Sequence, residues 1–124
     1  PDQALYVVNN TFVNDRPDGV FIANYTPAAA SVINNLFVGK GVPVQGPADN
    51  RANRQFTDGD IIQDRAAYDY RLRAGAAAID QGAMPGETDW GFSLRPTHEV
   101  THGLEIVERQ VVDALDIGAH EWQP

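Results

Sequence analysis

Five consecutive residues in the last third of the chain match the zinc-binding pattern of a class of peptidases. The order is His-Glu-Val-Thr-His, and on a helix His98 and His102 would share one face and bind Zn²⁺. Glu99 would then act as general base on the zinc-bound water. Pro96 and Gly103, however, leave room for only a short helix. The same residues also alternate as a strand does, so we predict a structural strand or loop and no metal site here. Zinc bound by His98 and His102 is the alternative.

Carboxylates gather near the middle of the chain. Asp58, Asp60 and Asp64 could supply the two carboxylates that a glycoside hydrolase places on either side of the scissile bond. Asp58 and Asp60 could also give oxygens to a Ca²⁺ ion, but such an ion takes about six to eight oxygen ligands. A solvated acidic turn explains the same residues without any ligand. We therefore predict no cofactor, with calcium as the ion to be tested first.

Arginine and tyrosine residues offer a second kind of site. Arg51 and Arg54, beside Asn50 and Asn53, could neutralise the carboxylate of a sugar acid next to the base of a polysaccharide lyase. Tyrosine rings could stack on sugar rings, although aromatic residues in so short a chain more often belong to the core. A solvated loop is the plain alternative for the arginines. The candidate substrate-binding residues are Arg51, Arg54, Tyr68 and Tyr70, and no catalytic residue is assigned.

An internal repeat indicates the elements that must position these residues. Residues 5–14 read LYVVNNTFVN and residues 30–40 read ASVINNLFVGK. Matching residues are displaced by 25 positions (33 − 8 = 25), a period that is typical of a solenoid of stacked repeats. The matched pairs are Val8/Ile33, Asn9/Asn34, Asn10/Asn35, Phe12/Phe37 and Val13/Val38.

Each repeat is predicted to contain three short strands. The apolar runs are short, rich in Val, Ile and Phe, and bounded by turn formers, as strands are. Coils of this kind form a parallel β-helix, in which neighbouring strands lie about 4.8 Å apart. The paired Asn residues would then form a ladder at a corner, since Asn tolerates left-handed backbone geometry and its amide can bond to the Asn above and below. The predicted strands are 5–8, 11–13 and 19–23 in the first repeat, and 31–33, 36–38 and 42–44 in the second.

The composition limits the classes of function. A chain of 124 residues with 43% hydrophobic and 21% charged residues is sufficient for one folded domain with a modest core. Its net charge of −8 argues against binding to nucleic acid, and would repel an anionic polysaccharide unless cations cluster. Absence of cysteine rules out disulfides and thiolate metal sites. No apolar run is long enough to span a membrane, and the start does not resemble a signal peptide.

The N-terminal edge of the predicted coils is expected to bind a partner. Strand-like sequence follows Pro1-Asp2-Gln3 at once, so the first coil would present an open edge, which natural proteins usually cover. We expect this edge to contact either the remainder of a longer β-helix or another copy of the chain.

Two segments of the C-terminal half resemble a known family. Residues 69–82 read DYRLRAGAAAIDQG, and residues 114–122 read ALDIGAHEW. These segments resemble the D-[YF]-R-L-x-x-G-S-P-A-I-D-x-G stretch and the closing D-I-G-A-[YFH]-E motif of bacterial right-handed parallel β-helix proteins of the pectate-lyase-like superfamily. Ala76 and Ala77 stand where that family usually has Ser-Pro. With the Asn-containing coils, the resemblance covers most of the chain.

The resemblance implies a fold and a broad function. The fold is all-β, a right-handed parallel β-helix with C-terminal coils in residues 1–62 and a closing, capping segment of the same domain in residues 63–124. The function implied is that of a secreted or cell-surface protein that binds polysaccharide or acts on it, as a lyase or glycoside hydrolase, with the active site largely outside this segment. Two alternatives remain: a structural surface or filament module that assembles through its open coil edge, and a zinc metallopeptidase.

Overall fold

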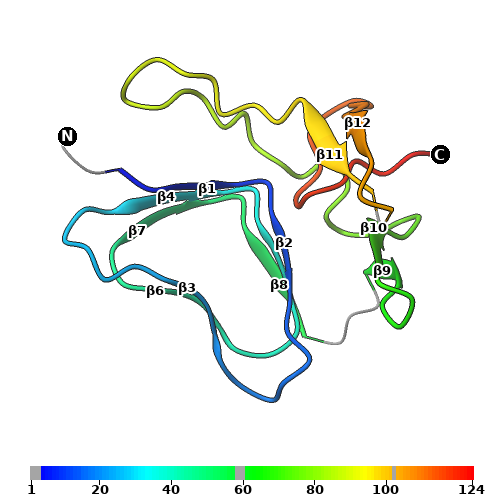
Figure 1. Cartoon of the computed structure of the whole chain (residues 1–124), viewed down its shortest axis with the longest axis horizontal. Coiled ribbons are helices and arrows are strands. Elements are labelled where there is room, and N and C mark those ends of the chain that lie inside the picture. Colours follow the sequence, from blue (N-terminus) through cyan, green and yellow to red (C-terminus); the bar gives the residue numbers. More distant parts are fainter. Residues whose placement is uncertain (1–3, 58–60, 102) are drawn as a thin grey trace.

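The computed structural model describes residues 4–57, 61–101 and 103–124, which form an all-β structure. This part of the chain contains β-strands and no helix, and so no helix that could cross a membrane. The first eight strands form three stacked coils (Figure 1). They are β1 (Tyr6–Val8), β2 (Thr11–Val13) and β3 (Val20–Ala23) in the first coil; β4 (Ala30–Ile33), β5 (Leu36–Val38) and β6 (Val42–Gln45) in the second; and β7 (Ala48–Arg51) and β8 (Arg54–Phe56) in the third.

The coils stack through parallel sheets, which confirms the predicted parallel β-helix. The strand orders are β1-β4-β7, β2-β5-β8 and β3-β6, and every neighbour in these sheets runs parallel. Val8 pairs with Ile33 and Phe12 pairs with Phe37, as the repeat requires. The second and third coils are related by a shorter step of 18 residues, from Asn35 to Asn53, because the loops after β5 and β6 are short.

Apolar side chains fill the interior of the coils. The rings of Phe12 and Phe37 stack with centroids 5.4 Å apart, and Phe21 lies 5.2 Å from Phe37. The predicted corner is also present, since Asn9 and Asn34 adopt left-handed backbone angles with φ of 52° and 58°. The chain thus turns from the first sheet to the second at these two asparagines.

The remainder of the chain packs against the outside of the coils. Strands β9 (Ile62–Asp64) and β10 (Asp69–Leu72) form one antiparallel pair, and β11 (His98–Val100) and β12 (Ile106–Glu108) form another. Tyr70, one of the candidate substrate-binding residues, therefore lies in β10. A second core, separate from the coil interior, joins the outer face of β5 to this region. Its buried members are Leu36, Val38, Ile61, Ile62, Leu72, Ala78 and Ile117.

This second half lies beside the coils. In Figure 1, the view runs along the stack, and the segment from β9 to the C-terminus lies outside the corner where the β1 sheet meets the β2 sheet. The second core thus joins this segment to the side of the coils. We call residues 61–124, as far as they are described, the lateral segment.

Candidate functional site

The predicted substrate-binding residues lie in two separate places. Arg51 and Arg54 line a hollow of about 410 Å³ at the third coil, together with Asn50 and Asn53. Tyr68 and Tyr70 instead line a cleft in the lateral segment. The arginines and the tyrosines therefore do not form one binding site.

The arginines at the third coil have structural partners. The Nη2 atom of Arg51 donates hydrogen bonds to the carbonyls of Met84 and Pro85, at 3.1 and 3.2 Å. Arg54 lies over the ring of Phe56, 5.3 Å from its centroid. No carboxylate or imidazole is among the described residues that line this hollow. The arrangement suits the polar end of a coil stack better than the base and cation of a lyase.

The segment with the zinc-peptidase pattern is a strand. His98, Glu99 and Val100 form β11, which pairs with β12, so His98 and Glu99 point to opposite faces. The predicted strand is thus confirmed, and the helix that would place two histidines on one face is not formed in the described part of this segment. His102 lies outside the described residues, as do Asp58 and Asp60. Within the described ranges, no group of three metal-ligating side chains is present.

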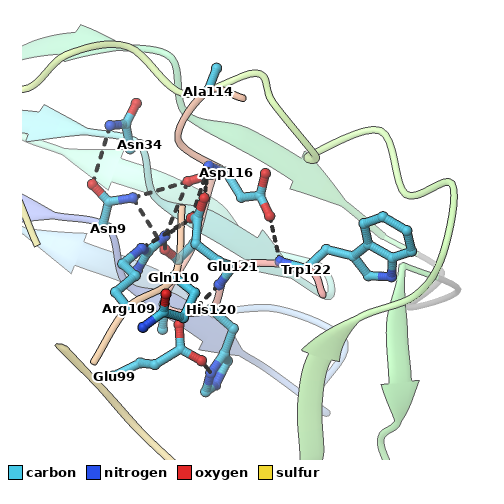
Figure 2. Close-up of polar contacts among 12 residues, drawn as sticks. Asn9, Asn34, Glu99, Arg109, Gln110, Ala114, Asp116, His120, Glu121 and Trp122 are labelled. Atoms are coloured by element: carbon cyan, nitrogen blue, oxygen red, sulfur yellow. Dashed lines mark hydrogen bonds and ion pairs between the residues drawn. The ribbon is translucent and has the colours of Figure 1, made fainter. Parts of the chain in front are cut away.

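A buried ion pair lies in the lateral segment. Arg109 and Glu121 each have side chains that are 1% exposed. Arg109 Nε donates to Glu121 Oε2 at 3.0 Å, and Arg109 Nη2 donates to the same oxygen and to the Gly118 carbonyl. Glu121 Oε2 also accepts the backbone N–H of Asp116 at 3.0 Å. Figure 2 shows this pair at the centre of a wider polar network.

The network continues into the corner of the coils. Asn9 Nδ2 donates to the carbonyls of Asp116 and Gly118, at 3.0 and 3.2 Å (Figure 2). Asn34 donates through Nδ2 to Asn9 Oδ1 and to the Ala83 carbonyl, and its Oδ1 accepts the N–H of Ala83. The backbone N–H of Gly118 donates to the Asn34 carbonyl at 2.8 Å. The asparagines that form the coil corner therefore also hold the lateral segment in place.

Asp116 closes the network on its far side. Its carboxylate accepts the N–H of Trp122 at 2.6 Å and that of Asp80 at 2.7 Å. Burial raises the pKa of Asp116 above its ordinary value, although both hydrogen bonds oppose the shift. Burial likewise raises the pKa of Glu121, against the lowering effects of the Asp116 N–H and of Arg109. Both acids are enclosed by protein and accept hydrogen bonds from the backbone of the lateral segment.

A cleft lies next to this network. It has a volume of about 630 Å³ and runs between the β9–β10 hairpin and the β11–β12 hairpin. Glu99 Oε1 lies 3.4 Å from His120 Nδ1, and Glu99 Oε2 accepts the N–H of Glu121 at 3.0 Å. Burial raises the pKa of Glu99, but hydrogen bonds from His120 and Glu121 and the charges of His120 and Arg109 together hold it below its ordinary value.

Arg109, the central residue of the buried network, was not predicted from the sequence. Asp116 and Glu121 belong to the closing motif, but Arg109 was not connected with them. Two acids within an otherwise apolar stretch were the available signal, because a buried carboxylate requires a cation or several donors. The pairing of Glu99 with His120 was also missed.

Comparison of the chain with models of known protein families, with curated proteins and with solved structures gave no match.

Proposed function

We propose that the chain is a scaffold module of a secreted or cell-surface β-helix protein that binds polysaccharide or acts on it. In this proposal the lateral segment locks the coils, and the first coil receives a further β-helix coil. The observation that carries the scaffold role is a difference between the two ends of the coil interior, which is apolar at the first coil and polar at the third.

The first coil presents partly exposed apolar side chains that a further coil would bury. Val7 and Phe12 are in register with Val32 and Phe37 of the second coil, which are 0% and 1% exposed. Val7 and Phe12 themselves are only half-buried. Covering such apolar surface is favourable, and a parallel coil also pairs the edge strands β1, β2 and β3.

The third coil is a polar end. Asn50 and Gln55 occupy the positions that Val32 and Phe37 hold in the second coil. Gln55 Nε2 donates to the carbonyls of Gly39 and Gly41, each at 3.0 Å, and so closes this end of the interior. Terminal repeats of solenoids carry such polar faces.

The asparagine ladder has a direction that favours addition at the first coil. Asn35 Nδ2 donates back to the Val7 carbonyl of the first coil, and Asn53 Nδ2 donates back to the Val32 carbonyl of the second. Asn10 in the first coil donates instead to the carbonyl of Val8 in its own strand, at a long 3.3 Å. A preceding coil would offer Asn10 the missing carbonyl and would donate to its Oδ1.

The same asymmetry bears on the alternative of a self-assembled filament. Head-to-tail stacking of two copies would place Val7 and Phe12 against Asn50 and Gln55, and would bury polar amides against apolar side chains. A coil with an apolar interior is the better partner. The polysaccharide role and the location rest on the resemblance of residues 69–82 and 114–122 to β-helix proteins of the pectate-lyase-like superfamily.

Extension of the chain by one coil tests this proposal. A copy of residues 5–29, which form the first coil and its connecting loop, is joined ahead of the chain. We expect cooperative unfolding at a temperature raised by about 5 °C or more, because the added coil buries the apolar end. The matched control carries lysine at the Phe12 position and alanine at the Asn10 position of the added copy. Equal melting temperatures for the two fusions, or a separate transition for the added coil, would contradict the proposal.

A further inference from the structure

We propose that the cleft between the β9–β10 and β11–β12 hairpins binds an uncharged sugar unit of a polysaccharide. This inference goes beyond the scaffold role, since it assigns a ligand site to the lateral segment. It rests on the proposed function only in taking the ligand to be a polysaccharide.

The size and walls of the cleft suit a sugar. A volume of about 630 Å³ lies within the range of small-ligand sites. Tyr70 contributes a ring that also packs against the core beside β5, so its position is fixed. Tyr68 and Leu104 form the outer walls and are 64% and 84% exposed. Aromatic rings offer an apolar face to the C–H side of a sugar and a hydroxyl to its polar edge.

The charged groups of the cleft are paired with one another. Arg71 donates from Nε and Nη2 to the two carboxylate oxygens of Asp69, at 2.8 and 2.7 Å. These hydrogen bonds lower the pKa of Asp69, so the pair is ionised and neutral as a whole at pH 7. Glu99 is held by His120 and by the N–H of Glu121. Among the described residues, Arg71 Nη1 and the second nitrogen of the His120 ring have no hydrogen-bond partner, and both could bind a ligand.

This charge balance selects the class of ligand. An anionic sugar such as a uronate would meet two carboxylates and a chain with a net charge of −8. A cationic ligand would have to displace Arg71 from Asp69 or His120 from Glu99. A neutral sugar needs neither, because its hydroxyls accept from arginine and donate to carboxylate or imidazole without a change of charge. The cleft is therefore complementary to neutral sugar units.

Nuclear magnetic resonance titration of the whole chain tests the inference. The probes are cellotriose, maltotriose, mannotriose and xylotriose, with trigalacturonate as the anionic comparison. We expect at least one neutral trisaccharide to shift the amides of residues 67–71, 99–101 and 120 in a saturable manner. Trigalacturonate is expected to leave these amides unchanged. Failure of every neutral trisaccharide to shift them, or tighter binding of trigalacturonate, would overturn the inference.

A pair of tyrosine variants locates the binding. Tyr68→Ala is expected to raise the dissociation constant of the trisaccharide about tenfold, through loss of one aromatic wall. Tyr25→Ala is the matched control, since Tyr25 is 88% exposed on a loop of the coils and does not line the cleft. Equal weakening by the two substitutions would overturn the assignment. The scaffold role is tested by the melting temperature of the coil fusion, and sugar binding is tested by the resonance titration. Either one can therefore fail while the other holds.

Discussion

At the scale of single residues, the Arg109–Glu121 pair is a buried contact that ties together parts of the lateral segment. Both side chains are almost fully enclosed, and Arg109 also donates to the carbonyls of Asp116 and Gly118. Removing one member of such a pair leaves the other as an uncompensated buried charge, which is far more costly than removing both. The contribution of the pair to the free energy of unfolding must therefore be measured with single and double variants.

We predict that Arg109→Met lowers the free energy of unfolding by about 3–5 kcal/mol. The double variant Arg109→Met/Glu121→Met should cost less than the sum of the two single changes, because no charge is left alone. Urea denaturation, followed by circular dichroism, measures each value. Arg16→Met is the control, since Arg16 lies exposed on a loop, and should change stability by less than about 0.5 kcal/mol. Additive losses from the two single changes would show that the pair is not coupled.

The lowered pKa of Glu99 predicts that the free energy of unfolding depends on pH. The folded state holds the pKa of Glu99 below its ordinary value of 4.5, so the folded chain binds fewer protons there than the unfolded chain does. The stabilisation is present above pH 4.5 and is lost as the pH falls through the lowered pKa. Asp116 and Glu121 act in the opposite direction, since burial raises their pKa values and the folded chain binds more protons at these two groups than the unfolded chain does. Comparison of a Glu99 variant with the unchanged protein isolates the contribution of Glu99.

We therefore expect Glu99→Gln to cost about 1–2 kcal/mol at pH 7, through its weakened bonds to His120 and Glu121. The cost should shrink as the pH is lowered below 4.5, where Glu99 in the unchanged protein becomes protonated as well. Urea denaturation at a series of pH values gives the difference between the two proteins. Glu105→Gln, an exposed change in the same hairpin, should have little effect at any pH. A cost that is constant from pH 7 to pH 3 would contradict this account.

At the scale of elements, the asparagine ladder couples the three coils. Asn35 is fully buried and bonds to both neighbouring coils: its Oδ1 accepts the N–H of Asn10, and its Nδ2 donates to the Val7 carbonyl and to Asn53. Its own N–H donates to Asn53 Oδ1 at 2.8 Å. The ladder thus satisfies backbone groups that the corner removes from the sheets.

Asn35→Ala is predicted to destabilise the chain by about 2–4 kcal/mol, because it removes the acceptor of the Asn10 N–H and the side-chain hydrogen bonds to the Val7 carbonyl and to Asn53. Asn10→Ala should cost clearly less, since Asn10 is half-buried and its side chain reaches only one neighbouring coil. Thermal and urea denaturation of the two variants give the comparison. Equal costs would mean that the ladder does not depend on contacts to both sides.

Most of the elements in the coils could be predicted from the sequence, for a physical reason. Residues 25 positions apart stack in register, so the same side chains are needed twice, as Phe12 and Phe37 show. The third coil follows after only 18 residues and has polar residues at its inward positions. It therefore matches neither the 25-residue period nor the apolar pattern of the first two coils. The strand at β10 could be predicted from its alternation.

The candidate site could be predicted only in part. Arg51 and Tyr70 are 19 residues apart in sequence (70 − 51 = 19), yet they lie on different elements and in different hollows. Conversely, the network joins residues as far apart as Asn9 and Gly118, separated by 109 positions. Local pattern carries no information about such contacts, since they depend on how the lateral segment folds back on the corner.

At the scale of the whole molecule, the coils and the lateral segment are joined through residues that contact both. β5 contributes Phe37 to the coil interior, while its Leu36 and Val38 belong to the second core. Gly118 lies against Leu36 and Thr11, where an added Cβ would come within 2.7 Å of Thr11 Oγ1. We therefore infer that coils and lateral segment unfold together as one unit.

Native-state hydrogen exchange, read by nuclear magnetic resonance, tests this claim most directly. The amides to compare are those of Leu36, which bonds to the Asn10 carbonyl between coils, and of Gly118, which bonds to the Asn34 carbonyl from the lateral segment. The account predicts that both exchange with the same free energy of opening, and that Arg109→Met lowers both by the same amount. If Gly118 exchanges much more readily while Leu36 stays protected, or if Arg109→Met affects Gly118 alone, the lateral segment is an appendage and does not lock the coils.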